Sequence, residues 1–377
     1  MPWKEVSAMS ERKEFIERIQ QEEVSFSVVC REFGVSRPTG YKWLRRYAEN
    51  GEAGIVEHSR RPHRSPKRTS PEMERAILSV RSTHPSWGGV KILAYLERLG
   101  QKHLPSASTA TAILQRNGKL DPQESCKHRP MQRFERAASN ELWQMDFKGH
   151  FKLDQGRCHP LTILDDHSRY LVGLHACPNQ LWETVQSQLT TTFRSYGLPD
   201  CMLMDNGSPW GDDWDSPYTI LTSWIMRLGV AVTHGRPFHP QTQGKDERLH
   251  RTLQAEVLQG AQFHTLQQCQ NQFDVWREFY NHERPHQALH HSVPAEAYHP
   301  SPRPFPETLP PILYEPADVV RMVDESGKIS YRNKPYRISK AFRFSPVALR
   351  PTETDGILDV YYCSFRVAQI HLRDQQS

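Results

Sequence analysis

The spacing of apolar residues changes twice along this chain, and that change constrains the fold more than any other feature. Up to about residue 120 the apolar residues recur every three or four positions, as on an amphipathic helix. From about residue 141 short alternating segments, typical of strands, occur between helical ones. After seven prolines between Pro300 and Pro316, alternation continues alone. The sequence therefore predicts helical, mixed α/β and all-β domains in that order.

Those changes of pattern place the domain boundaries. A length of 377 residues is itself typical of two or three domains. We predict two helical modules at 1–57 and 70–125, linkers at 58–69 and 126–140, a mixed-sheet core at 141–299, a stiff proline-rich linker at 300–316, and a small β domain at 317–377.

Charge is distributed unevenly along the chain. The net charge is +9 in residues 1–140, −6 in residues 141–300 and +5 in residues 317–350. Phosphate binding needs Lys and Arg, whereas binding of a catalytic metal needs carboxylates. The pattern is therefore typical of a nuclease core between DNA-binding domains, although solvated basic surfaces give the same pattern.

Several classes of protein are excluded by composition. The longest apolar stretches, such as residues 170–174, are far shorter than the roughly 18 residues of a membrane span, and the polar N-terminus lacks a signal peptide's apolar stretch. We expect a cytoplasmic protein without membrane contact. The seven cysteines stand singly, which argues against disulfides and zinc fingers. No G-x-x-x-x-G-K-[ST] loop is present, so ATP is not expected.

The first helical module has the pattern of a helix-turn-helix. A Gly34-Val35-Ser36 turn separates two amphipathic segments, and Ser36 is a suitable N-cap. A small helical bundle with a basic surface is an equally good interpretation of this segment alone. The residues expected to contact DNA from this module are Arg37, Thr39, Lys42, Arg45 and Arg46.

The second module begins at Ser70-Pro71, and its last helix is a candidate second recognition helix. The basic linker before it either lies along a DNA backbone or acts only as a solvated tether. Its expected phosphate contacts are Arg60, Arg61, Arg64, Lys67 and Arg68.

Three carboxylates of the core occupy positions that meet at one edge of a mixed sheet. Asp146 lies in the first predicted strand, Asp205 ends a later buried strand, and Glu247 begins a helix. Oxygen ligands suit Mg²⁺ or Mn²⁺, and two such ions support phosphoryl transfer. Taken singly, each carboxylate is more typical of a cap or a surface charge.

Four sequence strings occur in a characteristic order. They are WQMDFKG (143–149), DNGSP (205–209), HPQTQGKDERLHRTL (239–253) and YNHERPHQAL (280–289). Together they resemble the bacterial insertion-sequence transposases of the retroviral-integrase-like DDE superfamily. The resemblance implies an RNase H-like core in which Asp146, Asp205 and Glu247 bind two Mg²⁺ or Mn²⁺ ions, with helix-turn-helix modules before it and an SH3-like barrel after it.

The resemblance also implies a function. A DNA transposase would bind the terminal inverted repeats of its element, cleave the ends and join the 3′-hydroxyl to target DNA, acting as a homodimer or a higher oligomer. Two alternatives are a catalytically inactive transposase-derived DNA-binding protein or repressor, and an RNase H-like nuclease without strand transfer. Further expected DNA contacts are Lys245, Arg248 and Arg251 in the core, and Arg321, Arg332, Lys334, Arg337, Lys340 and Arg343 in the barrel.

Some assignments stay open at this point. Asp246 competes with Glu247 for the third position: helical periodicity does not decide between them, and the family pattern favours Glu247. The family's usual basic residue two turns later is Gln254 here, so Arg251 or Arg248 is expected to replace its phosphate contact. Asp165 and Asp166 are interpreted as turn residues. No zinc is assigned to the histidines at 234, 239, 282 and 286.

Overall fold

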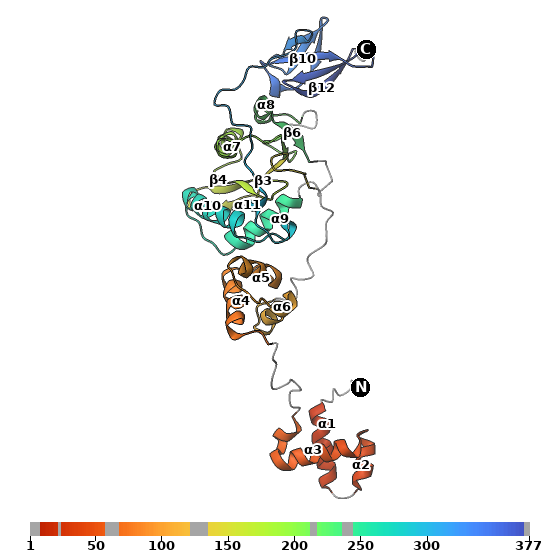
Figure 1. The fold of residues 1–377 in the computed structure, drawn as a ribbon. Coiled ribbons are helices and arrows are strands. Elements are labelled where there is room, and N and C mark those ends of the chain that lie inside the picture. The colour runs from red at the N-terminus through yellow and green to blue at the C-terminus, as the bar shows by residue number, and fades with distance from the viewer. Residues whose placement is uncertain are drawn as a thin grey trace. The chain divides into compact units, whose positions relative to one another are not determined.

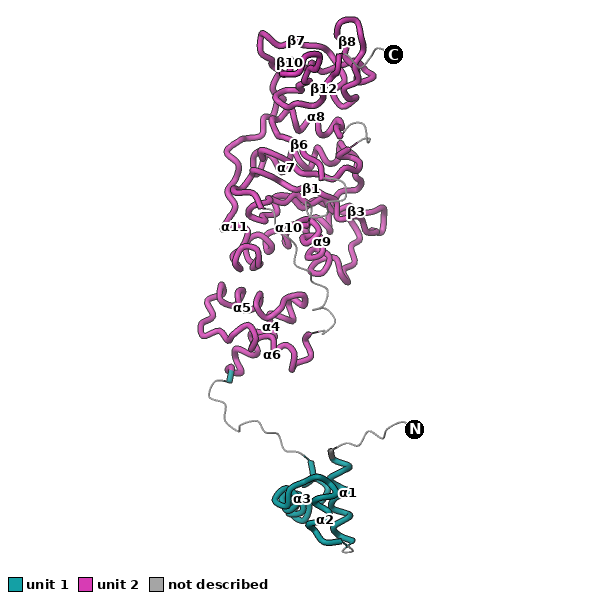
Figure 2. The backbone as a smooth tube through the Cα atoms, turned by 90° about the vertical axis from the view of Figure 1, so that its right-hand side faces the viewer, with its two compact units in different colours: residues 1–68 teal, residues 69–377 magenta. Residues whose placement is uncertain are grey.

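The computed structural model describes residues 8–21, 24–56, 68–120, 135–211, 217–235 and 244–372. The chain divides into two compact units, residues 1–68 and residues 69–377, which Figure 2 shows in different colours.

The first unit is a three-helix module. Its elements are α1 (Ala8–Gln20), α2 (Phe26–Glu32), α3 (Arg37–Asn50) and the 3-10 helix η1 (Gly51–Ile55). The turn before α3 contains Gly34 at a φ of +62°, and Ser36 caps α3 by accepting a hydrogen bond from the Thr39 amide. A Cβ at Gly40 would lie 2.9 Å from Cys30 Sγ, so glycine allows α3 to pack closely on α2. The predicted helix-turn-helix is confirmed.

The second unit begins with another helical module, formed by α4 (Pro71–Thr83), α5 (Gly89–Arg98) and α6 (Ala107–Arg116). Ser70 and Ser106 cap α4 and α6 through their hydroxyl oxygens. The three helices bury Ile77, Ile92 and Ile113 in one apolar cluster.

The core is a mixed sheet. Its strands are β1 (Trp143–Phe147), β2 (Phe151–Lys152), β3 (Arg157–Asp165), β4 (Leu171–Cys177), β5 (Cys201–Met204) and β6 (Ala231–His234). β3 pairs antiparallel with β1, β2 and β4, whereas β5 pairs parallel with both β1 and β6. The predicted RNase H-like mixed sheet is confirmed (Figure 1).

Helices cover both faces of this sheet (Figure 1). They are α7 (Trp182–Tyr196), α8 (Ile220–Arg227), α9 (Gly244–Leu253), the π-helical turn η4 (Gln254–Leu258), α10 (Leu266–His282), η5 (Gln287–Leu289) and α11 (Pro294–Ala297). Successive residues of a strand face opposite sides. Leu171 accordingly packs with Leu249 and Phe273 from α9 and α10, whereas Val172 packs with Phe193 from α7.

The proline-rich segment, predicted as a linker, lies against the core. Arg303 donates hydrogen bonds to the carbonyls of Pro199 at 2.8 Å and Gly229 at 2.6 Å, and its own carbonyl accepts one from Leu198. Phe305 packs against the apolar cluster beneath α7. At least its first part is therefore structural.

The last domain is all-β, as predicted. Its elements are β7 (Val319–Met322), β8 (Lys328–Tyr331), β9 (Lys334–Arg337), the 3-10 helix η6 (Lys340–Phe342), β10 (Pro346–Pro351), β11 (Ile357–Tyr362) and β12 (Phe365–His371). β12, β11, β10 and β7 form an antiparallel sheet in that order, and β8 pairs with β9. In residues 317–372 this pairing leaves two open sheets, so the closed barrel that we predicted is not formed by it.

Two further features bear on the sequence predictions. Among the helices described, none has both the length and the apolar character that a membrane span requires. The six cysteines within the described ranges are free thiols, and Cys126 lies outside those ranges.

Candidate active site and DNA-binding surfaces

Asp146 and Asp205 meet at the carboxyl edge of the sheet. β1 and β5 are parallel neighbours, with Gln144 opposite Leu203. Extending that register by two residues on each strand places Asp146 beside Asp205. Because adjacent strands are about 4.8 Å apart, the two carboxylates share one small region.

This pair of carboxylates lacks compensating positive charge. Burial, and then the charge of Asp205, raise the pKa of Asp146 to about 6. A hydrogen bond that the Asp146 carboxylate accepts from the Phe147 amide at 2.8 Å lowers the pKa and so partly opposes this rise. Within the described residues, neither carboxylate forms an ion pair with Lys or Arg. Unpaired carboxylate oxygens at a partly exposed edge fit a hard cation such as Mg²⁺ or Mn²⁺.

His250 belongs to this region, and the sequence analysis missed it. The Thr162 hydroxyl donates to the Asp146 carbonyl at 3.0 Å and lies 2.9 Å from His250 Nε2, so that nitrogen must be the donor. The other nitrogen, Nδ1, is then an acceptor and lies 3.9 Å from the Asp146 carboxylate. The His250 Nδ1 atom and the Asp146 carboxylate thus face each other as acceptors, and a cation between them fits this arrangement. The sequence feature that could have indicated His250 is its position about one helical turn after Glu247.

Glu247 and Asp246 face different surroundings. Glu247, in the first turn of α9, has a side chain that is 56% exposed, and Arg251 lies 4.0 Å from its carboxylate. Asp246 is only 2% exposed, and burial followed by the charges of Asp146 and Asp166 raises its pKa well above the usual value. One Asp246 oxygen has no hydrogen-bond partner among the described residues.

The structure thus brings Asp146, Asp205 and Asp246 within electrostatic range, and it leaves Glu247 at the surface of the same helix. Within residues 8–372, apart from the gaps stated above, no three His, Cys, Asp or Glu side chains are arranged to hold a metal ion. The assignment of Asp146, Asp205 and Glu247 as metal ligands therefore stays a prediction.

Asp165 and Asp166 have structural roles. The Asp165 carboxylate accepts hydrogen bonds from the amide and hydroxyl of Ser168, as expected of a turn residue. Asp166 instead pairs with Lys245 and accepts a hydrogen bond from Gln144 Nε2 at 2.6 Å. Lys245, which we predicted to contact DNA, is thereby held by a buried internal partner.

The helical DNA-binding candidates are partly free and partly engaged. Arg37, Lys42 and Arg45 are exposed on α3. The Thr39 hydroxyl lies 2.9 Å from Ser36 Oγ within the helix cap, and both the Lys42 ammonium and the Arg46 guanidinium lie over the Trp43 ring. The predicted contacts Arg60, Arg61, Arg64 and Lys67 lie outside the described residues, whereas Arg68 lies at the end of the first unit.

The last domain presents a basic surface around β8, β9 and η6. Five of its predicted contacts make no ion pair within the described residues: Arg332, Lys334, Arg337, Lys340 and Arg343. Arg321 differs, because its guanidinium donates hydrogen bonds to the carbonyls of Ser330 and Val320. In the core, Gln254 is exposed at the start of η4.

A buried polar junction joins the second helical module to the core, and nothing in the sequence had indicated it. Glu256 on η4 accepts hydrogen bonds from Arg284 on the core and from the Trp87 indole at 3.0 Å. The side chains of Glu256 and Arg284 are each only 8% exposed. Burial by itself raises the pKa of Glu256. The Arg284 charge and these hydrogen bonds lower it further than burial raises it, so the pKa stays below its usual value.

Aromatic stacking extends the same junction. His84 stacks on Trp87 with centroids 4.1 Å apart, and Phe279 of α10 stacks on His84 at 5.0 Å. Lys91 lies over the Trp87 ring, and burial followed by the Arg284 charge lowers its pKa to about 7. The second module is therefore held on the core by a desolvated cluster.

The histidines considered for zinc have other neighbours. His234 Nδ1 lies 3.0 Å from the Asp205 carbonyl, and His282 lies 3.5 Å from the Glu278 carboxylate. Burial lowers the pKa of His286 well below its usual value. His239 lies outside the described residues.

Comparison with known families covers most of the chain. Two models of the integrase core domain match residues 136–240 and 228–294, and the C-terminal domain of IS481 family transposases matches residues 318–377. The chain therefore contains an integrase core domain followed by a C-terminal domain of the IS481 transposase type. A helix-turn-helix domain model matches residues 11–63, and a homeodomain-like domain model matches residues 39–114.

Individual relatives are distant. An uncharacterized 31.7 kDa protein of insertion element IS407 from Burkholderia multivorans is 26% identical over 159 residues, which are 42% of this chain and 55% of that protein. The chain thus spans about half the length of this curated relative.

Two solved structures are similar at low identity. A simian T-cell lymphotropic virus intasome in complex with the PP2A regulatory subunit B56 gamma is 16% identical, with a TM-score of 0.38 over 78% of this chain and 95% of that one. The HTLV-2 integrase catalytic core domain in complex with magnesium, trimeric form, is 12% identical, with a TM-score of 0.32 over 43% and 99%. Neither similarity carries a functional argument.

Proposed function

We propose that this protein is a DNA transposase that binds the terminal inverted repeats of its insertion sequence, cleaves a strand at each element end and joins the freed 3′-hydroxyl to target DNA. The observation that carries the proposal is the uncompensated pair Asp146 and Asp205 at the carboxyl edge of parallel strands, in the same compact unit as a helix-turn-helix-type module. Water and then the 3′-hydroxyl serve as nucleophiles.

Asp146, Asp205 and Glu247 would hold two Mg²⁺ or Mn²⁺ ions. When bound, such ions activate the attacking oxygen and stabilise the leaving one. We assign the third position to Glu247 because a DNA strand reaches exposed groups, and Asp246 is almost fully buried. Asp146 is fixed by the Phe147 amide, and His250 completes the rim with an acceptor nitrogen.

Binding of DNA is assigned to three regions. The exposed cations of α3 would read the repeat in a major groove. The unpaired cations of the last domain would neutralise phosphates of the end or of the target. Because two element ends must be held together, we propose at least a dimer on DNA.

One experiment tests the proposal directly. The full chain is incubated with Mg²⁺ and duplexes that carry the DNA ends flanking its own coding sequence, and strand breaks and joined products are mapped. Breaks at the element ends with joining to a second duplex are expected. Specific binding without any cleavage would instead identify an inactive DNA-binding protein or repressor, and cleavage without joining would identify a nuclease.

A further inference from the structure

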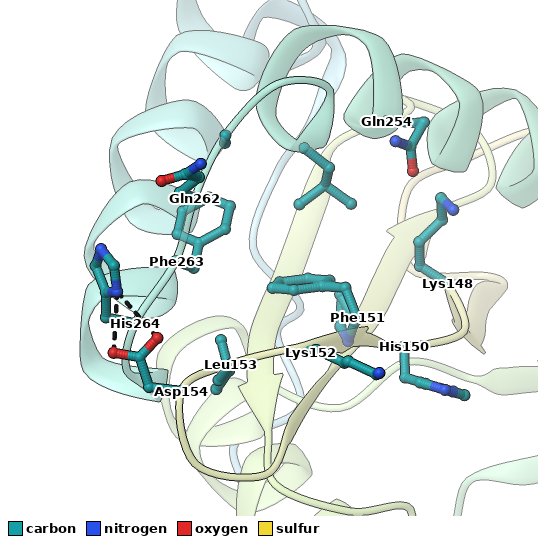
Figure 3. A pocket seen from close by; sticks show the side chains of 13 residues that line it. Lys148, His150, Phe151, Lys152, Leu153, Asp154, Gln254, Gln262, Phe263 and His264 are labelled. Atoms are coloured by element: carbon teal, nitrogen blue, oxygen red, sulfur yellow. Dashed lines mark hydrogen bonds and ion pairs between the residues drawn. The ribbon is translucent and has the colours of Figure 1, made fainter.

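A cavity of about 400 Å³ lies between β2, the end of β1 and the segment that follows α9 (Figure 3). Phe151, Leu258 and Phe263 form its apolar part, and the two phenyl rings lie 5.5 Å apart. Figure 3 shows Phe151 between Lys148 and Gln254 on one side and the Asp154–His264 pair on the other. Its size is in the range of small-molecule sites, about 300–1,000 Å³.

The cavity adjoins the candidate active site through two of its lining residues. Lys148 follows Asp146 by two residues, and its charge acts on His250, which lies 3.9 Å from the Asp146 carboxylate. Gln254 follows Glu247 by seven residues, which is about two helical turns and hence the same side of the helix. A DNA strand at the carboxylates would therefore pass the cavity.

The polar groups of the lining are available to a ligand. Within the described residues, neither Lys148 nor Lys152 makes an ion pair, and the side-chain amides of Gln254 and Gln262 make no hydrogen bond. The single carboxylate, that of Asp154, is 3.0 Å from His264 Nδ1, so the lining does not suit a metal ion. Ammonium groups suit a phosphate, free amides suit the edge of a base, and phenyl rings suit its face.

We propose that this cavity binds one unpaired nucleotide of the element end while the adjoining phosphodiester lies at Asp146 and Asp205. The inference rests on the proposed function, because it needs a DNA end at those carboxylates. Taking a base out of the duplex costs the free energy of its pairing. Stacking of the base on Phe151, together with phosphate contacts to Lys152, offsets that cost. The end would thereby be held open for cleavage.

The test measures binding without chemistry. The full chain is titrated, without divalent metal, against fluorescent end duplexes whose terminal nucleotide is unpaired, on each strand in turn. Matched duplexes have an abasic sugar at that nucleotide. For one of the strands we expect the duplex with the base to bind about tenfold tighter, since stacking of one base on an aromatic ring contributes about that factor.

Phe151→Leu removes the ring and keeps an apolar side chain at a partly buried position. We expect it to reduce the tenfold preference to about one while binding to the rest of the repeat persists. Phe305→Leu is the control, because it removes a ring from the other apolar cluster of the core and should keep the preference. Thermal melting confirms that both variants fold.

The outcomes separate this inference from the proposed function. No base preference in the wild type, or an unchanged preference in Phe151→Leu, would overturn the nucleotide site even if the ends are bound and cleaved. Failure to bind the repeat over random DNA, together with no Mg²⁺-dependent cleavage, would overturn the proposed function itself.

Discussion

The two helical modules are both three-helix folds with serine N-caps, but they differ in what completes their interiors. Among the described residues, Phe15, Val29 and Ile55 of the first module pack in a cluster whose members all belong to the same unit. In the second module, the cluster around Trp87 includes Phe279 from the core, and the Glu256 carboxylate accepts a hydrogen bond from the Trp87 indole N–H. One module is self-contained, whereas the other shares its interior with the catalytic domain.

That difference separates two tasks. A module with its own interior does not need another domain for its fold, so it suits a search for a DNA site. A module held by a buried ion pair and stacked rings cannot move without exposing desolvated charge. We infer that the second module fixes the distance between bound DNA and the carboxylates of the core.

The largest expected effect lies at the carboxylates of the core. Asp146→Asn, Asp205→Asn and Glu247→Gln should each reduce cleavage and joining by about a thousandfold or more, because metal-ion charge stabilisation contributes several kcal/mol. Binding of the repeat should change little, which a gel shift beside a cleavage assay measures. Asp246→Asn is the matched comparison: if it abolished activity and Glu247→Gln did not, our third ligand would be wrong.

The junction itself can be broken next. Glu256→Gln keeps the shape of the side chain but leaves Arg284 buried without a counter-charge, so the second unit should lose about 3–5 kcal/mol of stability. Hydrogen exchange read separately for the two units measures this. Glu52→Gln, at an exposed ion pair with Lys13 in the first unit, is the control and should change little. Equal effects of the two variants would contradict the comparison.

The first module should matter for binding rather than for chemistry. Arg37→Ala, Lys42→Ala and Arg45→Ala should each weaken repeat binding and reduce its salt dependence, by about one unit of slope for each lost phosphate contact. Titrations at several salt concentrations measure the slope. Lys13→Ala removes an exposed cation from α1 of the same unit and should leave it unchanged; an equal loss would indicate a general basic surface.

The smallest effect is a dependence on pH. Lys91 has a pKa of about 7 in the folded chain instead of 10.5, so above pH 7 the unfolded chain binds more protons. Stability of the second unit should therefore rise between pH 7 and 8.5, by at most about 1.4 kcal/mol per pH unit. Denaturation of wild type and Lys91→Gln at both pH values checks this, because the variant should lack the rise. A rise of the same size in the variant would assign it to another group.

Much of the architecture could be read from local patterns. Ser36, Ser70 and Ser106 begin helices because a hydroxyl caps free amides within three residues, and this needs no distant partner. The alternation in β1 and the turn after β5 likewise placed Asp146 in the first strand and Asp205 at the end of a later one. The family resemblance followed from motifs in order, and it predicted the integrase core.

Tertiary structure alone decided the rest. The sequence could not distinguish Asp246 from Glu247, because burial of one and exposure of the other depend on how α9 lies on the sheet. Lys245 is a cation of the kind that contacts DNA, yet the carboxylate of Asp166, 79 residues away, pairs with it.

The junction at Glu256 and the role of Arg303 show the same limit. Trp87 and Glu256 are 169 residues apart, and Arg303 donates hydrogen bonds to carbonyls 74 and 104 residues away. Helix and strand periodicities predict which face of an element is apolar, but they do not predict which distant residue contacts that face. The sequence therefore determined the elements, their order and the family, whereas packing between remote segments decided which charges are available for DNA and which hold the protein together.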